Sequence, residues 1–268
     1  MIEWIATFWI IILAAVIGGG GLGSLGSYVV GMRIPFISIV MSHAAMLGAV
    51  FAYLTGLPTF PCSLALSLFA AFALGQFSGE SSRIGSNIHT SILFSLMIGL
   101  TFLGMGMSKQ DMTPLLGLMW GSILFVQTGD LWIMAGGALG LVIFGILFHD
   151  ELKAILFSKK LARSSGIRVK LITSIFLILA AAIITSNLEI VGGLLIYSLL
   201  TCPAAAAFEL GKNLKQILVY SMSFGIISAA GGFWISYQAD LPTGSCITLT
   251  AVLIYGISHV IRKSKLIR

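Results

Sequence analysis

Long apolar stretches alternate with short polar connections along almost the whole chain. Each apolar stretch lasts ~20 residues, the length that a helix needs to cross the hydrocarbon core of a bilayer. Lipid offers the backbone no hydrogen-bond partners, so such stretches must form helices with internal bonds. The pattern predicts an all-α integral membrane protein with about nine transmembrane helices, at residues 5–31, 34–55, 58–77, 90–108, 131–148, 170–187, 190–210, 216–237 and 244–262.

Composition indicates that lipid is the solvent for most of the exterior. Hydrophobic residues make up 58% of the 268 residues and charged residues only 9%, against about 25% charged in soluble domains. We therefore expect one polytopic transmembrane domain over residues 1–268. The net charge of +6 does not indicate a nucleic-acid partner, because the basic residues lie in short loops and at the C-terminal tail.

The loop charges predict the orientation of the spans. Positive charge is retained on the cytoplasmic side of a membrane, and nine spans with the N terminus outside place nearly all basic loops and the C terminus in the cytoplasm. A further span at 113–127 would move the basic 151–170 loop outside, so 114–126 is predicted to be a short outer helix or a re-entrant segment. The basic loops and tail contain Arg33, Arg83, Lys153, Lys159, Lys160, Arg163, Arg168, Lys170, Lys212, Lys215, Lys263, Lys265 and Arg268.

Small residues form ridges on the first two spans. In the first span Gly19, Gly23 and Ser27 follow one another at a spacing of four. Small residues at this spacing let helix backbones approach closely in lipid, so the ridges predict a compact bundle and name no function. The ridge of the second span contains Ser38, Ser42, Ala45, Ala49 and Ala52.

His43 is the one ionisable residue that lies well inside a predicted span. Burying such a group costs several kcal/mol unless it is paired or hydrated, so it is a functional candidate. Imidazole is a common ligand of transition metals, and Met46 adds a soft thioether one turn later. The alternative is a structural histidine that hydrogen-bonds a neighbouring helix carbonyl or the hydroxyl of Ser42.

Pro203 lies inside the seventh predicted span. Proline removes one backbone hydrogen bond and breaks or kinks a helix. We interpret Pro203 as a kink or gating residue, because irregular backbone at membrane depth often lines a cavity. Irregular packing without a function fits the sequence equally well.

The loop at 150–169 is the longest predicted cytoplasmic connection, and its apolar residues alternate with Lys and Arg. It is either an amphipathic helix at the membrane surface or a docking element for a cytoplasmic partner. The sequence has no P-loop, no HExxH and no serine-hydrolase elbow. We therefore expect no enzymatic activity of its own, and any ATP hydrolysis must come from another subunit.

Six stretches, in order along residues 15–262, resemble the membrane permeases of ATP-binding-cassette importers for zinc, manganese and iron, the ABC-3 family. The first carries a Gly-rich helix that ends in a basic residue, the second an SHA-x-x-x-G helix, and the fourth an ARxxGI coupling-loop motif. The stretches are GSLGSYVVGMRIPF, MSHAAMLGAVFAYLTG, LMWGSILFVQTGDL, LARSSGIRV, IVGGLLIYSLLTCPAAAAF and DLPTGSCITL.

The resemblance implies a type II importer permease in a bacterial cytoplasmic membrane. Two permease subunits, identical or different, would surround a central path, with a cytoplasmic ATPase docked on each and an external metal-binding protein delivering zinc, manganese or iron. The chain itself would bind no cofactor, because ATP belongs to the partner. His43 would be a transient metal ligand, and the residues that couple to the ATPase would be Leu161, Ala162, Arg163, Gly166 and Ile167.

One position departs from the family pattern. The family commonly has Asp four residues before this histidine, but here the position is Ile39. An apolar side chain cannot bind a divalent ion, so two copies of this chain would lack both carboxylates. Either a different partner permease supplies the Asp, or the ligand is unusual, or the transit site is weak; we favour the first.

Two other classes of protein compete with the importer. A secondary carrier driven by an ion gradient usually shows an inverted repeat and an acidic residue in mid-membrane, and neither is apparent. An intramembrane enzyme acting on lipids needs paired catalytic groups at the interface, whereas the acids and histidines here are scattered.

Overall fold

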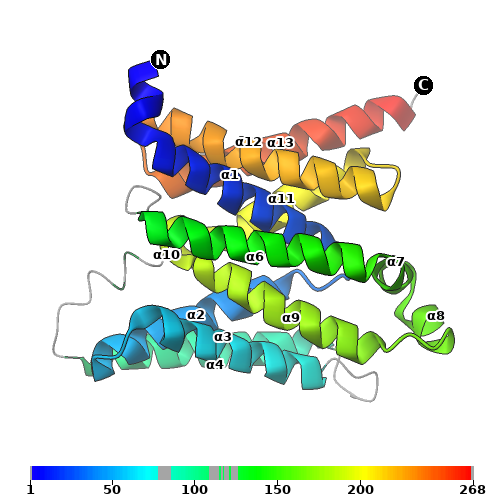
Figure 1. Cartoon of the computed structure of the whole chain (residues 1–268), viewed down its shortest axis with the longest axis horizontal. Coiled ribbons are helices and arrows are strands. Elements are labelled where there is room, and N and C mark those ends of the chain that lie inside the picture. Colours follow the sequence, from blue (N-terminus) through cyan, green and yellow to red (C-terminus); the bar gives the residue numbers. More distant parts are fainter. Residues whose placement is uncertain are drawn as a thin grey trace.

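Helices form all the regular structure that the computed structural model describes, which covers residues 2–77, 86–108, 115, 117, 121 and 126–266 (Figure 1). The helices are α1 (Ile2–Gly31), α2 (Phe36–Thr55), α3 (Thr59–Phe77), α4 (Ser86–Met107), α6 (Thr128–Leu147), α7 (His149–Phe157), α8 (Lys159–Ser164), α9 (Val169–Ser186), α10 (Leu188–Val191), α11 (Gly193–Leu210), α12 (Leu214–Ala239) and α13 (Thr243–Leu266).

Eight of the described helices are long and apolar enough to cross a membrane, namely α1, α2, α3, α4, α6, α9, α12 and α13. They coincide with eight of the nine predicted spans, and their ends differ from the prediction by a few residues. The prediction of an all-helical polytopic membrane protein is therefore confirmed.

The remaining predicted span, 190–210, is divided in two. Gly192 has a φ of +89°, which a continuing α-helix does not allow, and it separates α10 from α11. The apolar part of α11, Leu195–Leu210, is shorter than the other spans. The helix continues through Pro203, so the proline does not break it, and its role as a kink or gating residue stays a prediction. A transmembrane helix tolerates such a proline when neighbouring groups hydrogen-bond the backbone atoms that the proline leaves unpaired.

The helices lie side by side, with α1, α6 and α9 between α12–α13 on one side and α2–α4 on the other (Figure 1). The short helices α7 and α8 lie at one end of the bundle and α10 at the other. The N terminus is at the α10 end and the C terminus at the α7–α8 end. This placement agrees with an odd number of crossings, as in the predicted topology.

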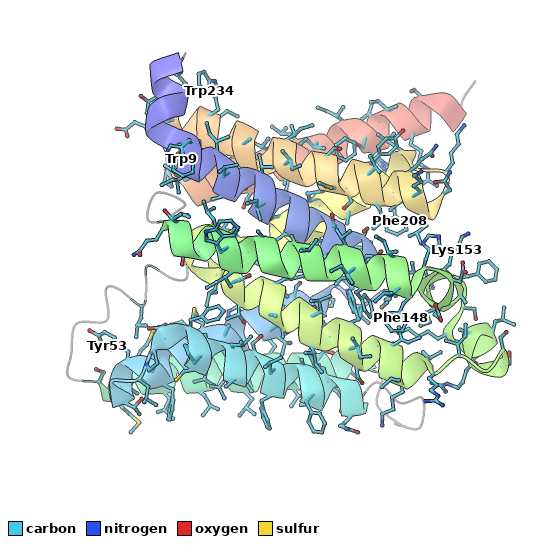
Figure 2. The ribbon with its side chains drawn as sticks, in the orientation of Figure 1. Trp9, Tyr53, Phe148, Lys153, Phe208 and Trp234 are labelled. Atoms are coloured by element: carbon cyan, nitrogen blue, oxygen red, sulfur yellow. The ribbon has the colours of Figure 1, made fainter. Side chains whose placement is uncertain are left out.

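Trp9, Tyr53 and Trp234 lie toward the end of the bundle with the N terminus, whereas Lys153 lies at the other end, together with Phe148 and Phe208 (Figure 2). Trp9 and Trp234 are each 46% exposed. Such half-exposed aromatic rings are enriched where the bilayer meets water.

The predicted small-residue ridge of the first span packs α1 against α12. A methyl group added to Gly19 would lie 2.5 Å from the Gly225 carbonyl oxygen, and one added to Gly23 would overlap the Ser221 carbonyl. The Ser221 hydroxyl also donates a hydrogen bond to the Gly23 carbonyl. The two backbones therefore touch, as the spacing predicted.

The segment 114–126, predicted to be a short outer or re-entrant helix, lies mostly outside the described residues. Its Leu115 is buried against Ala49 of α2. Gly121 has a φ of +66° and lies so close to Gly192 that a side chain would overlap the backbone there. These contacts hold part of the segment against the junction of α10 and α11.

We expect Gly23→Ala to destabilise the protein, because the added methyl group would overlap the Ser221 carbonyl and overpacking costs about 1–3 kcal/mol. Gly99→Ala is the control, since an added methyl group there meets no atom within 4 Å. The thermal unfolding midpoint in detergent should fall for Gly23→Ala and stay level or rise slightly for Gly99→Ala. Equal midpoints for both variants would show that α1 and α12 are not packed this tightly.

Candidate functional site

His43 lies in α2 and is 3% exposed, so the bundle encloses it. Its Nδ1 lies 2.9 Å from the carbonyl oxygen of Ile39, one turn earlier in the same helix. Its ring also packs against the ring of Phe94 from α4 in a T-shaped arrangement, with 5.0 Å between the ring centroids. The Nδ1 atom is thus used in a hydrogen bond, and the ring is held by an aromatic contact.

This geometry decides which nitrogen of His43 can bind a cation. A carbonyl oxygen only accepts hydrogen bonds, so Nδ1 must carry the proton that is donated to Ile39. In the neutral imidazole the lone pair then lies on Nε2. Metal-binding histidines are held in the same way, by donating their other N–H to a carbonyl or carboxylate. The structural hydrogen bond and a ligand role are therefore compatible.

The side chain of Ile39 forms part of a cavity wall. It lines a cavity of about 250 Å³ between α2 and α4, together with Val40, the Phe94 ring and the residues Thr90 and Ser91. The family's carboxylate would therefore stand next to hydroxyl groups, whereas the isoleucine makes this wall apolar. Position 39 orients the histidine only through its backbone.

Met46, the soft ligand type predicted one turn after His43, is 1% exposed and faces a different neighbour. A methyl group built on Gly193 of α11 would lie 3.9 Å from its sulfur, whereas His43 contacts α4. Within the described residues, no three side chains of His, Cys, Asp or Glu gather closely enough to hold a metal ion. His43 therefore does not belong to such a group among the described side chains.

The predicted coupling loop folds as α7 and α8, and its apolar residues divide into two groups. Leu152, Ile155 and Ala162 are at most 2% exposed and belong to the core of the bundle. In contrast, Phe157 is 83% exposed and Leu161 is 56% exposed. The loop thus anchors itself to the protein and leaves two large apolar side chains uncovered at the end of the bundle.

The LARSSGI motif ends α8 with a Schellman cap, in which a glycine with positive φ follows the helix. The Gly166 amide donates to the Arg163 carbonyl (3.1 Å), and the Ile167 amide donates to the Ala162 carbonyl (3.1 Å). Gly166 has a φ of +82°. Ala162, Gly166 and Ile167 are therefore explained by the shape of the loop, whereas Leu161 and Arg163 are exposed at its surface.

Sequence reasoning missed Phe157, which is the most exposed large hydrophobic side chain of this segment. Phe157 ends α7 and Leu161 lies in the separate helix α8, so no spacing within one helix indicated its exposure. Pro203 is buried in α11, away from the coupling segment. Leu200 lies one turn before Pro203 in α11. Its carbonyl oxygen is so close to Gly26 of α1 that a methyl group added to Gly26 would overlap it.

The architecture defines the class of protein. Membrane-length helices packed side by side, with a short helix pair anchored at one end, form a polytopic membrane protein. A model of the ABC 3 transport family matches residues 5–262, and the chain therefore belongs to this family. It is a permease subunit of an ABC transporter, so the predicted family is confirmed.

Relatives and one solved structure agree with this placement. The manganese transport system membrane protein MntC of Listeria monocytogenes is 27% identical over 238 residues, which cover 89% of this chain and 84% of that protein. The manganese import system permease protein ScaB of Streptococcus parasanguinis is 28% identical over 259 residues, 95% of this chain and 91% of that protein. The structure of PsaBC from Streptococcus pneumoniae in complex with Fab contains a chain that superposes with a TM-score of 0.83 at 25% identity, covering 96% of this chain and 95% of that chain.

We expect Gly166→Ala to loosen the end of α8, because a side chain in the left-handed region costs roughly 1–2 kcal/mol. Hydrogen exchange of the backbone amides in residues 158–168 should become faster. Asn tolerates this conformation better, so Gly166→Asn should have a smaller effect. Exchange in Gly166→Ala that is as slow as in the unmodified protein would contradict the assigned cap.

Proposed function

We propose that this chain is the membrane-spanning subunit of an ATP-driven importer of a divalent transition metal, with manganese as the substrate that its relatives favour. The observation that carries the proposal is the match of about nine-tenths of the chain to manganese permeases from two bacterial genera. The whole chain would act as one permease domain. The alternative, a carrier driven by an ion gradient, is not favoured by these relatives.

We further propose that the α7–α8 end of the bundle faces the cytoplasm of a bacterial cell. Lys153, Lys160 and Arg168 are exposed at this end, and positive charge next to a span favours the cytoplasmic side. The N terminus would then lie outside and the C terminus inside. The external metal-binding protein would deliver its ion at the α10 end.

A cytoplasmic ATPase would dock on the exposed part of the coupling segment. Phe157 and Leu161 offer an apolar contact, and Arg163 adds a charge beside it. Apolar anchors with a polar surrounding are typical of binding sites on protein surfaces. Because Leu152 and Ile155 of α7 are buried in the core, a push on this segment would be transmitted into the bundle rather than absorbed by a loose loop.

The metal would pass His43 on its way through the pair of permease subunits. Nε2 would be a transient ligand, and the missing carboxylate at position 39 would come from a different partner permease. A site with few ligands from this chain suits transport, since a transit site must bind weakly enough to release its ion. An unusual ligand or a weak site remain the alternatives for the same position.

The docking proposal predicts that Leu161→Asp uncouples the transporter. A charge at an apolar anchor removes a contact worth about 2 kcal/mol or more, so ATPase binding should weaken roughly 30-fold and uptake should fall with it. Lys215→Asp also adds negative charge at this end but lies in the first turn of α12, and it should keep ATPase binding. Co-purification of the ATPase and metal uptake in vesicles measure both. Normal uptake by Leu161→Asp would refute the docking site.

The metal-path proposal predicts that His43→Gln abolishes uptake while the complex assembles and hydrolyses ATP at its basal rate. Loss of even an outer partner at a metal site costs roughly 10–100-fold, so uptake of radioactive manganese should fall at least about tenfold. Ser42→Ala is the matched control, because the Ser42 hydroxyl also donates to the Ile39 carbonyl (3.0 Å) but offers no imidazole. Full uptake by His43→Gln would leave His43 as a packing residue.

A further inference from the structure

The cavity that Ile39 lines lies next to His43, toward one end of the bundle. Its wall consists of the first turns of α2 and α4, and its volume is about 250 Å³. Successive spans run in opposite directions, so α2 and α4 both begin at the α7–α8 end (Figure 1). The cavity is therefore on the cytoplasmic side of His43 in the orientation proposed above. Its described lining residues are Phe36, Ile39, Val40, Thr90, Ser91 and Phe94.

Phe94 separates His43 from this cavity. Its ring contacts the His43 ring, with 5.0 Å between the centroids and 83° between the planes. The same side chain forms part of the cavity wall, whereas His43 is not among the lining residues. His43 itself is 3% exposed. One aromatic ring therefore lies between the candidate ligand and the space beside it.

The cavity wall is partly polar. Thr90 and Ser91 contribute hydroxyl groups to it, and the exposed Ser95, one turn later, donates a hydrogen bond to the Ser91 carbonyl (3.0 Å). Thr90 and Ser91 interact within the protein, but a hydroxyl that donates one hydrogen bond still accepts others. One water molecule needs roughly 10–15 Å³ and polar partners. The cavity provides both, so it suits several water molecules.

Phe94 has room to turn away from His43. An engineered cavity of about 150 Å³ is enough to hold a benzene molecule, whereas the space beside the Phe94 ring measures about 250 Å³. An aromatic side chain on a helix has two common χ1 wells, and a change of well moves the ring without moving the helix. Such a turn would uncover the imidazole of His43.

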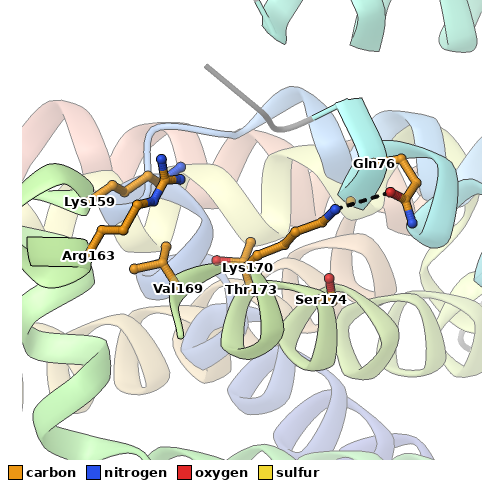
Figure 3. A pocket seen from close by; sticks show the side chains of 8 residues that line it. Gln76, Lys159, Arg163, Val169, Lys170, Thr173 and Ser174 are labelled. Atoms are coloured by element: carbon orange, nitrogen blue, oxygen red, sulfur yellow. Dashed lines mark hydrogen bonds between the residues drawn. The ribbon is translucent and has the colours of Figure 1, made fainter. Parts of the chain in front are cut away.

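The helices around the cavity are connected to the coupling segment. Lys170, in the first turn of α9, donates a hydrogen bond to the side-chain oxygen of Gln76 at the end of α3 (3.2 Å, Figure 3). Helix α3 in turn touches α2, since a methyl group added to Gly48 would lie 2.5 Å from the Cys62 carbonyl oxygen. A movement of α8 would therefore pass through α9 and α3 to α2, which carries His43.

We infer that Phe94 is a gate between His43 and a water-filled vestibule, formed by this cavity, through which the ion leaves toward the cytoplasm. The inference rests on the ligand role proposed for His43 above. With its ring on His43, Phe94 is an apolar barrier that excludes water, as hydrophobic constrictions do in channels. With the ring turned aside, His43 and the hydroxyl groups of Thr90 and Ser91 border one continuous space.

The first experiment measures how fast diethylpyrocarbonate modifies His43 in the purified full-length permease, with mass spectrometry locating the modified residue. Phe94→Ala removes the ring, and modification of His43 should become up to roughly tenfold faster, the factor that an aromatic contact is worth. Phe94→Leu keeps part of the barrier and should be intermediate. Phe102→Ala is the matched control, because this phenylalanine of α4 is 49% exposed and lies outside the cavity wall.

The second experiment tests for water in the cavity of the assembled transporter and leaves Phe94 in place. Cys62, Cys202 and Cys246 are first replaced by alanine. In inside-out vesicles, Ser91→Cys should then react with a trimethylammonium methanethiosulfonate, which is charged and needs water to reach its target. Ile92→Cys is the matched control, because Ile92 is 60% exposed but is not part of the cavity wall, so lipid should protect it.

The gate is supported if Phe94→Ala exposes His43, Phe102→Ala does not, and Ser91→Cys reacts faster than Ile92→Cys. Equal modification of His43 in both alanine variants would overturn it, and so would a Ser91→Cys variant that reacts no faster than Ile92→Cys. Thermal midpoints establish that the variants are folded, and Phe94→Leu replaces Phe94→Ala if the latter is not. These readouts require no transport, so the gate and the ligand role of His43, which uptake by His43→Gln tests, fail separately.

Discussion

Contact between helix backbones is the constraint on which the rest of this structure depends. Lipid tails are as apolar as leucine, so helices in a membrane gain little from burying large side chains and rely on close packing instead. Gly19 and Gly23 bring α1 against α12, and Gly26, further along nearly the same face, brings α1 against α11. These contacts fix the framework in which α2, with His43, is enclosed by its neighbours.

The two functional segments are held in different ways. His43 is oriented inside the bundle by its own helix and by Phe94. The coupling segment is fixed from outside the spans, because α7 buries Leu152 and Ile155 and α8 ends in a tight cap. The coupling segment at the surface and His43 inside the bundle are both held rigidly. Because packed cores do not deform continuously, a movement of whole helices can connect the two.

The sequence predicted most of the spans because lipid imposes a simple rule on length and polarity. It did not indicate the interruption at Gly192, because Pro203 was the stronger local signal, whereas the positive φ of Gly192 and its closeness to Gly121 are visible only in the fold. The sequence also indicated LARSSGI as a family motif but not the Schellman cap that ends α8. A glycine followed by an apolar residue, as at Gly166, is typical of such a cap. The exposure of Phe157 could not be predicted, since only the packing of α7 decides it.

The carbonyl oxygen of Ile39 accepts hydrogen bonds from two side chains, and this has an evolutionary consequence. Both Ser42 and His43 donate to this oxygen, and an unpaired carbonyl at this depth would be costly. The backbone amide of residue 43, one turn later in α2, and the Ser42 hydroxyl keep that oxygen satisfied whichever side chain occupies position 43. Natural variation can therefore alter the chemistry of the path at this point without unravelling the helix that carries it, so that relatives with one fold can diverge toward different ions.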